Sequence, residues 1–422
     1  MSNHHVKYFL LGGGLASSAA LGAIREVDPA GSCLLVGQEV LRPYDRTALS
    51  RDYLLGQRTR ADIFTIASDW YDRHEVHLRT GRRAAHLDTT RRAVTLDSAE
   101  EITFEKLLMA TGAAPLRLRI HGADLPNVFN LRTLDDADRL HHAIEQARQD
   151  GRRHARGRGR ALVVGAGLLG VELAVTLLGQ GLEVELVEAQ DRPWPRYSGE
   201  VAGRFLARWL EQRGVRLYVR NSPQRLEGDG RVQRALLGDG RVVDCDFVVV
   251  AIGVIPNKEL LRGTSIMAEK AILVDCYCQT SHADIYAAGD CAAIFDPLFG
   301  KYRHLDHWQS AMDMGRLAGL NMAGARRAYD QVNCLQTTLE SVPVRVWGEG
   351  RLVERRLVRG CAAPDEPDFM EIGVAADGRV AQVLAVGPCG QSPAAAAMVR
   401  QRLSVHGQED ALRDPAVPLP TR

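Results

Sequence analysis

The sequence predicts an α/β protein with two Rossmann-like dinucleotide-binding domains and a small α+β domain at its C-terminus. Two observations lead to this prediction. First, an apolar strand that runs into a glycine-rich turn and a small-residue helix occurs at residues 8–18 and again at residues 161–174. Second, from about Tyr329 onward the apolar residues form short strands separated by turns such as Asp377-Gly378, which is typical of an antiparallel sheet.

The bulk composition excludes several classes of protein. With 422 residues the chain is long enough for about two or three domains. Its net charge of +1 gives no general attraction to nucleic acid, and no apolar run approaches the length of a membrane span. The eight cysteines are scattered and include no C-x-x-C pair, and no secretory leader is expected. We therefore expect a cytoplasmic protein that binds neither nucleic acid nor a membrane.

The first turn fits a dinucleotide fingerprint. Gly12, Gly14 and Ser17 occupy its three small positions, which allow a sharp turn, a close approach of a pyrophosphate and close helix–strand packing. The pyrophosphate would lie on the free N–H groups of the helix N-terminus. Taken alone, such a motif can also be a simple turn. At the end of the next strand, Gln38 and Glu39 stand where an acidic residue usually holds a ribose.

The second turn matches the fingerprint in full, with Gly165, Gly167 and Gly170. The following strand ends in Glu188, at the spacing where a carboxylate binds the ribose of NAD and repels the 2′-phosphate of NADP. This feature favours NADH, although two arginines follow closely. A chain with two such sites can hold a flavin and a nicotinamide and pass a hydride between them.

Several other residues have both a functional and a structural explanation. The Arg-, Pro- and Tyr-rich stretch 42–56 is either a solvated surface loop or an extended segment that presents Arg46 and Arg51 to a cofactor. Asp290, which follows an apolar strand, either binds a ribityl hydroxyl or caps a helix. Trp308, at the start of a helix, either lies beside a flavin ring or packs in the core.

A Gly/Arg-rich stretch at residues 148–160 is expected to form a flexible surface loop. It contains no aromatic residues, which a nucleic-acid-binding segment would need, and docking of an acidic partner protein is the alternative. Before it, residues 132–138 predict a helix start, because carboxylates are favoured near a helix N-terminus.

Together these motifs resemble the flavoprotein NAD(P)H-dependent ferredoxin and rubredoxin reductases, relatives of apoptosis-inducing factor in the pyridine nucleotide–disulfide oxidoreductase superfamily. The resemblance covers about residues 7–325 and depends on the two glycine turns and on Pro43-Tyr-Asp-Arg46, Leu49-Ser-Arg51, Ala110-Thr-Gly112, Ala251-Ile-Gly253, Ala288-Gly-Asp290 and His307-Trp308. It implies an FAD-binding domain in two parts (1–116 and 253–326), an inserted NAD(P)-binding domain (117–252) and a C-terminal interface domain (327–422).

The resemblance also implies site residues. Those expected to bind the two cofactors are Gly12, Gly14, Leu15, Ala16, Ser17, Gln38, Glu39, Arg46, Arg51, Ala84, Ala110, Thr111, Gly112, Arg132, Gly165, Gly167, Leu168, Leu169, Gly170, Glu172, Glu188, Ile252, Gly253, Gly289, Asp290, His307 and Trp308. Arg51 and Glu172 are the candidate catalytic pair, which would position the flavin ring and hold the charge of its reduced state. No metal site is expected.

Three positions depart from the pattern of these reductases. Arg51 stands where they usually have the Lys that pairs with the acid at Glu172, and Arg is expected to keep both the charge and the pairing. Gln38 replaces an acid. The reductases often carry an aromatic Phe-Trp-Ser-type motif in the C-terminal domain. In this chain the most similar segment, residues 342–348, contains Trp347 but no adjoining Phe, so the sequence does not define the surface that binds the electron acceptor.

The implied activity is that of an FAD-dependent oxidoreductase, which takes hydride from NADH, less readily from NADPH, and passes electrons to an iron–sulfur carrier such as a ferredoxin or rubredoxin. The C-terminal domain is compatible with a homodimer. Two alternatives remain open. One is dithiol chemistry through Cys276 and Cys278, which one strand would place on the same face. The other is a slow redox sensor, similar to apoptosis-inducing factor, whose assembly responds to NADH.

Overall fold

The computed structural model describes residues 4–153, 157–391 and 393–420. The chain forms two compact units, each with its own sheets. The first consists of Met1–Asp45, Arg60–Ala114 and Val254–Gln331, and the second of Arg46–Thr59, Pro115–Gly253 and Val332–Arg422. The four-part domain division expected from the sequence stays a prediction.

The main sheet of the first unit has the strand order β3-β2-β1-β6-β5-β4, with β18 paired to β6. The bounds are β1 (His4–Leu11), β2 (Cys33–Val36), β3 (Val76–Arg79), β4 (Ala84–Asp88), β5 (Ala93–Leu96), β6 (Glu101–Met109) and β18 (Ile285–Ala287). Strands β3, β2, β1, β6 and β18 are parallel, so their carboxyl ends share one edge of the sheet. Strands β4 and β5 join it in antiparallel fashion.

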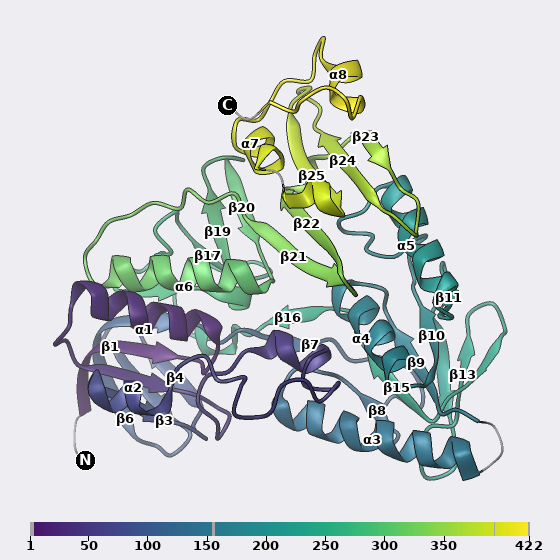
Figure 1. The fold of residues 1–422 in the computed structure, drawn as a ribbon. Coiled ribbons are helices and arrows are strands. Elements are labelled where there is room, and N and C mark those ends of the chain that lie inside the picture. The colour runs from purple at the N-terminus through teal and green to yellow at the C-terminus, as the bar shows by residue number, and fades with distance from the viewer. Residues whose placement is uncertain (1–3, 154–156, 392, 421–422) are drawn as a thin grey trace. The chain divides into compact units, whose positions relative to one another are not determined.

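Helices α1 (Leu15–Val27) and α6 (Trp308–Met322) lie side by side in the first unit (Figure 1). Glycines of α6 allow this close approach. A Cβ at Gly315 would lie 2.2 Å from the Ala16 carbonyl oxygen, and one at Gly319 would lie 2.4 Å from that of Ala20.

The remaining elements of the unit are α2 (Ser68–Arg73), β16 (Val254–Pro256), η2 (Glu259–Leu261), β17 (Ile272–Val274), η3 (Gly289–Cys291), β19 (Ala292–Asp296) and β20 (Lys301–His304); β7 (Ala113–Pro115) lies at its boundary.

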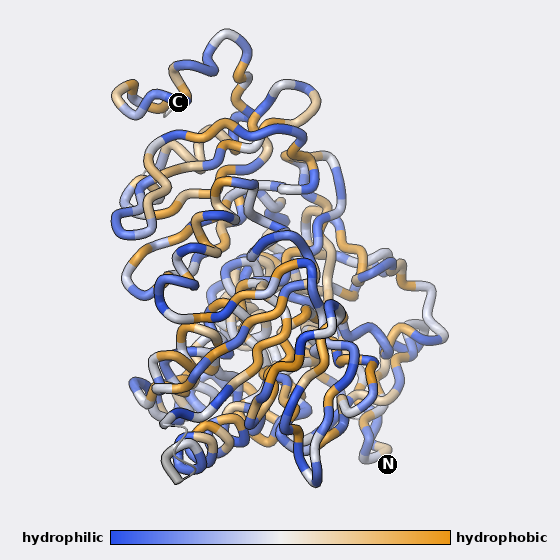
Figure 2. The backbone as a smooth tube through the Cα atoms, turned by 90° about the vertical axis from the view of Figure 1, so that its right-hand side faces the viewer, coloured by the Kyte–Doolittle hydropathy of each residue, from blue (hydrophilic) through white to orange (hydrophobic). Residues whose placement is uncertain are grey.

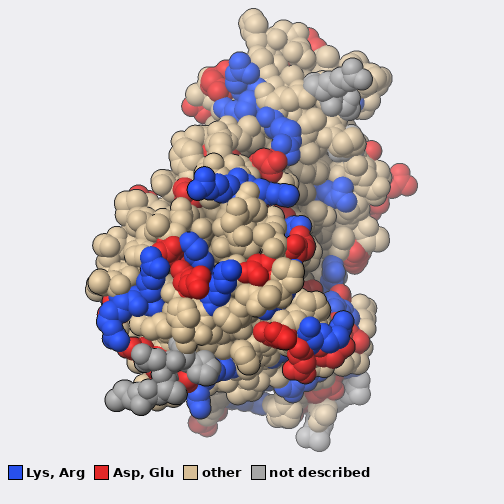
Figure 3. All heavy atoms as spheres, turned by 90° about the vertical axis from the view of Figure 1, so that its left-hand side faces the viewer, with Lys and Arg blue, Asp and Glu red and all other residues tan. Residues whose placement is uncertain are grey.

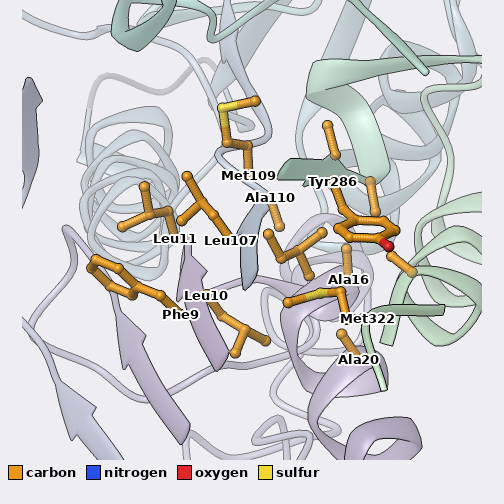
Figure 4. Close-up of a cluster of buried hydrophobic side chains, with 14 of the residues drawn as sticks. Phe9, Leu10, Leu11, Ala16, Ala20, Leu107, Met109, Ala110, Tyr286 and Met322 are labelled. Carbon is orange, nitrogen blue, oxygen red and sulfur yellow. The ribbon is translucent and has the colours of Figure 1, made fainter. Parts of the chain in front are cut away.

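The core of the first unit contains side chains from β1, β6, β18 and both long helices (Figure 4). Phe9 and Leu10 are successive residues of β1, so they point to opposite faces of the sheet, and both are fully buried. A strand buried on both faces reads as a continuous apolar run, which is the pattern that predicted this strand. Figure 2 shows several such hydrophobic stretches, coloured orange, running side by side.

The second unit contains a parallel sheet of order β11-β10-β9-β15-β8. Its elements are η1 (Arg46–Ser50), β8 (Val128–Phe129), α3 (Leu134–Arg153), β9 (Arg160–Val164), α4 (Leu168–Gly179), β10 (Glu183–Val187), α5 (Glu200–Gln212), β11 (Arg216–Tyr218) and β15 (Phe247–Val250), with a small meander of β12 (Pro223–Glu227), β13 (Arg234–Leu237) and β14 (Val242–Asp244). The predicted α/β class is confirmed by these two sheets, of which the first is mostly parallel and the second parallel, and each contains a strand, a glycine turn and a helix start in succession.

The C-terminal part of the second unit is an antiparallel sheet of order β21-β22-β25-β24-β23. Its elements are β21 (Cys334–Leu339), β22 (Val342–Gly348), η4 (Gly350–Leu352), β23 (Arg355–Cys361), β24 (Asp368–Val374), β25 (Val380–Val386), η5 (Pro388–Gln391), α7 (Ala394–Arg400) and α8 (Glu409–Arg413). The predicted antiparallel sheet is therefore present, and β21 is one of its two edge strands.

Three local predictions were wrong. Residues 148–153 continue α3 instead of forming a loop. The buried stripe of Leu140, Ile144 and Ala147 stabilises the helix up to this point, and Gly151 packs against the chain beyond it, since a Cβ there would lie 2.4 Å from the Arg158 backbone carbon. Residues 154–156 of the predicted loop lie outside the described residues. The 42–56 stretch is neither a solvated loop nor an extended segment. It contains η1, and Leu49 and Leu54 are buried.

The third correction concerns the two cysteines that one strand was expected to align. Strand β17 ends at Val274, so Cys276 and Cys278 lie in the turn that follows, and Cys278 has a positive φ of 62°.

Within the ranges that the structure describes, no helix has both the length and the apolar character needed to cross a membrane. The same residues include no cluster of three or more His, Cys, Asp or Glu side chains that could hold a metal ion.

Candidate functional site

The first glycine turn connects β1 to α1 at the carboxyl edge of the main sheet. Gly12 has φ +119°, and a Cβ there would lie 2.0 Å from the Ala110 carbonyl oxygen, so both the conformation and the close approach require glycine. Gly14 is the N-cap of α1 and differs, because a Cβ there would meet no atom within 4 Å. The glycine at position 14 therefore leaves open space beside the N–H groups that begin the helix. This cradle fits a pyrophosphate.

Ser17 takes the third small position of the turn and is fully buried. Its Oγ makes no hydrogen bond within the part of the chain that the structure describes. The side chain therefore acts by its small size, as the fingerprint requires. Leu15 and Ala16 complete the first turn of α1, and Gly289, after β18, lies against Ala16.

The second strand ends beside the same turn. A Cβ at Gly37 would lie 3.4 Å from the Gly13 Cα, so Gln38 and Glu39 follow directly at this edge. Gln38 is exposed, whereas Glu39 accepts a 2.5 Å hydrogen bond from the Tyr44 hydroxyl. Ala84 begins β4 nearby, since the amide of Arg82 donates to the Gly37 carbonyl at 3.0 Å.

The ends of β6 and β18 bring further predicted residues to this edge. Ala110, Thr111 and Gly112 follow β6, and the Thr111 hydroxyl donates to the Asn257 carbonyl at 2.8 Å. Asp290 lies in η3 directly after β18, and its carbonyl accepts a 2.8 Å hydrogen bond from His304 Nε2.

Helix α6 begins beside these strands with two predicted site residues. The ring of His307 caps the helix, because its Nδ1 accepts a hydrogen bond from the Ser310 amide at 3.3 Å. Trp308 is 43% exposed, so the core-packing alternative for this residue is wrong. An exposed indole at a helix start is free to stack on a flat ligand.

The second glycine turn repeats the geometry of the first between β9 and α4. Gly165 has φ +100°, and a Cβ there would lie 2.5 Å from the Ala251 carbonyl oxygen. A Cβ at Gly170 would lie 1.8 Å from the Gly165 carbonyl oxygen, whereas one at Gly167 would meet nothing within 4 Å. The middle glycine is again the one that leaves open space. Leu168 and Leu169 form the first turn of α4, and Ile252 and Gly253 follow the neighbouring strand β15.

Glu188 lies at the end of β10 and is 7% exposed. Its Oε2 accepts from the Ala166 amide at 2.7 Å, and its Oε1 accepts from the Gln190 amide at 2.8 Å. Each carboxylate oxygen keeps capacity for one more donor, such as a ribose hydroxyl. Arg192, one of the two arginines that follow, pairs with Asp191 at 2.9 Å.

The predicted pairing of Arg51 with Glu172 is wrong. Glu172, on α4, accepts hydrogen bonds from Ser50 Oγ at 3.0 Å and from Thr337 Oγ1 at 2.7 Å. Arg51 instead pairs with Asp52 at 2.9 Å, and its Nη1 donates to Thr338 Oγ1 at 2.6 Å. Two neighbouring threonines of β21 thus take one partner each. We define these six side chains as the Glu172 cluster.

The sequence reasoning missed Ser50, Thr337 and Thr338. Thr337 and Thr338 belong to none of the quoted motifs, whereas Ser50 lies within the Leu49-Ser-Arg51 stretch, where only Arg51 was assigned a role. The structure also brings two predicted residues together in the second unit, because Arg46 Nη1 donates to the Arg132 carbonyl at 2.7 Å.

The cysteines give no support to dithiol chemistry. Cys276 and Cys278 are both free thiols. Burial raises the pKa of both thiols, most strongly that of the fully buried Cys278, and so disfavours the reactive thiolate.

Comparison with known proteins places these features in a family. The family model "Pyridine nucleotide-disulphide oxidoreductase" matches residues 6–315. The ferredoxin–NAD(+) reductase component of the biphenyl dioxygenase system from Paraburkholderia xenovorans (strain LB400) is 31% identical over 401 residues, which cover 95% of this chain and 94% of that protein. Rhodocoxin reductase from Rhodococcus erythropolis is 31% identical over 76% of this chain and 73% of its own length.

A solved structure agrees along nearly the whole chain. The ferredoxin reductase for the CYP199A2 system from Rhodopseudomonas palustris superposes with a TM-score of 0.89 at 25% identity, covering 99% of both chains. These findings confirm the resemblance that the motifs indicated. The chain belongs to the pyridine nucleotide–disulphide oxidoreductase family, and it is an oxidoreductase related to the ferredoxin reductases.

Proposed function

We propose that this chain is an FAD-containing reductase that takes hydride from NADH and passes single electrons to a small iron–sulfur protein such as a ferredoxin or rubredoxin. The observation that carries the proposal is the repeated turn geometry. In both turns the first glycine is required by the backbone, and the middle glycine leaves open space at a helix N-terminus. Two nucleotide cradles are what a flavin and a nicotinamide need.

The first cradle is assigned to FAD. Gly12, Gly14 and Ser17 would hold the pyrophosphate, and Gln38 and Glu39 would face the ribose. Asp290 and Trp308 would serve the flavin end, because Asp290 lies in η3 directly after β18 and the start of α6 packs against η3, where a Cβ at Gly289 would lie 3.8 Å from the Ala311 Cβ. Arg46, Arg51 and Arg132 belong to the second unit, and their role toward the flavin stays a prediction. When bound, FAD supplies the chemistry that accepts a hydride from NADH and releases electrons one at a time.

The second cradle is assigned to NADH. Gly165, Gly167 and Gly170 would hold the pyrophosphate, and Glu188 would accept hydrogen bonds from the ribose hydroxyls. Because Glu188 is anchored by two backbone amides, its charge is fixed at this place and would repel a 2′-phosphate. The preference for NADH over NADPH follows from that charge.

The electron acceptor is proposed from the relatives. One is described as a ferredoxin–NAD(+) reductase component of a dioxygenase system. On the face shown in Figure 3, basic and acidic side chains are interspersed, in keeping with the net charge of +1. A homodimer and a cytoplasmic location stay predictions.

An anaerobic titration tests the proposal. We expect the purified protein to be yellow and to bleach with NADH at lower concentration than with NADPH. Rapid transfer to an added ferredoxin or rubredoxin would support the reductase, whereas slow reduction with a change in oligomer size would support the redox-sensor alternative. A protein that takes up no FAD, or that neither nucleotide bleaches, would contradict the proposal.

A further inference from the structure

The Glu172 cluster joins three parts of the second unit that are distant in sequence. Ser50 comes from η1, Glu172 from α4, and Thr337 from an edge strand of the C-terminal sheet. Glu172 lies on α4, the helix that begins at the Gly165–Gly170 turn, two residues after the last glycine of that turn. The C-terminal sheet therefore contacts the helix whose N-terminus forms the proposed NADH cradle.

The two threonines act from opposite faces of one strand. Leu335, Thr337 and Leu339 alternate along β21 on one face, and both leucines are buried. Thr338 lies on the other face, where its Oγ1 accepts from Arg51. Strand β21 thus keeps the Glu172 carboxylate and the Arg51 guanidinium apart, although their opposite charges attract each other.

The cluster leaves the Glu172 carboxylate oriented but not saturated. One hydroxyl donates to each of its oxygens, and each oxygen can accept at least one more hydrogen bond. A direct bidentate ion pair with Arg51 would occupy those positions. The hydroxyl clamp leaves them open to an N–H donor, such as the carboxamide of a nicotinamide.

We propose that Thr337 is a positioning residue for reduction by NADH, which fixes the Glu172 carboxylate together with Ser50 while Thr338 holds Arg51 away from it. This inference rests on the proposed function, since it assigns a role beside the NADH cradle. Thr337 itself touches neither cofactor and acts through Glu172. Its removal should therefore disturb orientation more than affinity.

The decisive variant is Thr337→Val, which keeps the shape of the side chain and removes its hydroxyl. We expect the rate of flavin reduction by NADH, measured anaerobically by stopped flow, to fall about tenfold because the carboxylate can rotate. The Kd of NAD+ for the FAD-loaded protein should stay within about twofold of the wild-type value. A crystal structure of the variant should show Glu172 turned toward Arg51 or without a fixed rotamer.

Two further variants make the test specific. Thr337→Ser keeps a hydroxyl and should restore a rate close to that of the wild type, and Gln336→Val alters an exposed residue of the same strand and should change neither quantity. A Thr337→Ser protein as slow as Thr337→Val, or a Thr337→Val protein as fast as the wild type, would overturn the inference.

If Thr337→Val does not fold, Ser50→Ala removes the other donor and should slow reduction in the same way, and an unchanged rate there would also overturn the inference. Failure of the proposed function would give a different experimental result. In that case the wild-type protein itself would not be reduced by NADH, and the inference would fall with it.

Discussion

The backbone amide of Ala166 donates a 2.7 Å hydrogen bond to Oε2 of Glu188. A carboxylate at the end of β10 thus supports the glycine turn that lies 22 residues earlier in the chain. The same side chain is proposed to bind the ribose, so turn support and nucleotide selection are combined in one residue.

Replacement of that carboxylate should weaken both functions. In Glu188→Gln the amide has one acceptor oxygen instead of two and no charge. We expect the Kd of NADH to rise about tenfold and the preference over NADPH to fall, as measured by anaerobic titration with each nucleotide. Glu183→Gln, at the start of the same strand, is the control and should leave both affinities unchanged. An unaltered preference in Glu188→Gln would argue against a role in selection.

Gly12 and Gly14 should respond differently to alanine. Gly14→Ala adds a methyl group where no protein atom lies within 4 Å, so the fold should persist while FAD content falls sharply. Gly12→Ala should instead lower the free energy of unfolding by about 2 kcal/mol or more, because its Cβ would clash with the Ala110 carbonyl. Flavin absorbance and thermal unfolding distinguish the two effects. Full FAD content in Gly14→Ala would contradict the assignment of the open space beside Gly14 to the cofactor.

Glu371 is expected to stabilise the second unit strongly. It is 1% exposed, and its oxygens accept from the Gly199 amide at 2.5 Å and the Ala202 amide at 2.8 Å at the start of α5. Glu371→Ala should reduce the free energy of unfolding by about 3 kcal/mol, because it leaves the buried amides and the Arg356 guanidinium without their carboxylate. Denaturant titration checks this value, with the exposed Glu354→Ala as control. Equal stability of the two variants would refute it.

Asp28 should make the stability of the first unit depend on pH. Its carboxylate accepts hydrogen bonds from Lys7 at 2.7 Å and Tyr8 at 2.8 Å, which hold its pKa below the ordinary value of 3.8. The stabilisation is therefore complete above the unfolded-state pKa and is lost as the pH falls below about 4. We expect wild-type stability to decline in that acidic range more steeply than the stability of Asp28→Asn. Parallel pH profiles of the two proteins would contradict this.

The thiols should be dispensable for reduction by NADH. Because burial disfavours their thiolates, Cys276→Ser combined with Cys278→Ser should leave the rate of flavin reduction unchanged in protein that retains FAD. Stopped-flow measurement decides the matter. A large loss of rate with full FAD content would revive the dithiol alternative.

The parts of the fold and of the candidate site that the sequence predicted depend on local constraints. Gly12 and Gly165 are recognisable because a positive φ and a close backbone approach exclude other residues. The apolar strands before them are recognisable because parallel strands are buried on both faces. Such signals lie within a few neighbouring residues and can be read without knowledge of the tertiary structure.

The surroundings of Glu172 could not be predicted in this way. Its hydrogen-bond partners lie 122 and 165 residues away in the sequence, and hydroxyl side chains carry no distinctive spacing. The expected ion pair between Arg51 and Glu172 was wrong for the same reason, since Thr337 and Thr338 of β21 each bind one of the two groups and Asp52 pairs with Arg51. The length of α3 was misjudged because the Gly/Arg-rich composition from residue 148 onward is typical of a loop, whereas the buried Leu140, Ile144 and Ala147 belong to a helix that continues through it.

The wide spacing of the Glu172 cluster also has a consequence for biosynthesis. Ser50 and Glu172 leave the ribosome long before Thr337, so their clamp stays incomplete until the C-terminal sheet has been translated and has folded. Contacts of such long sequence separation form late and slowly. A nascent chain could therefore assemble its glycine turns early, yet gain a fully oriented carboxylate only near the end of synthesis.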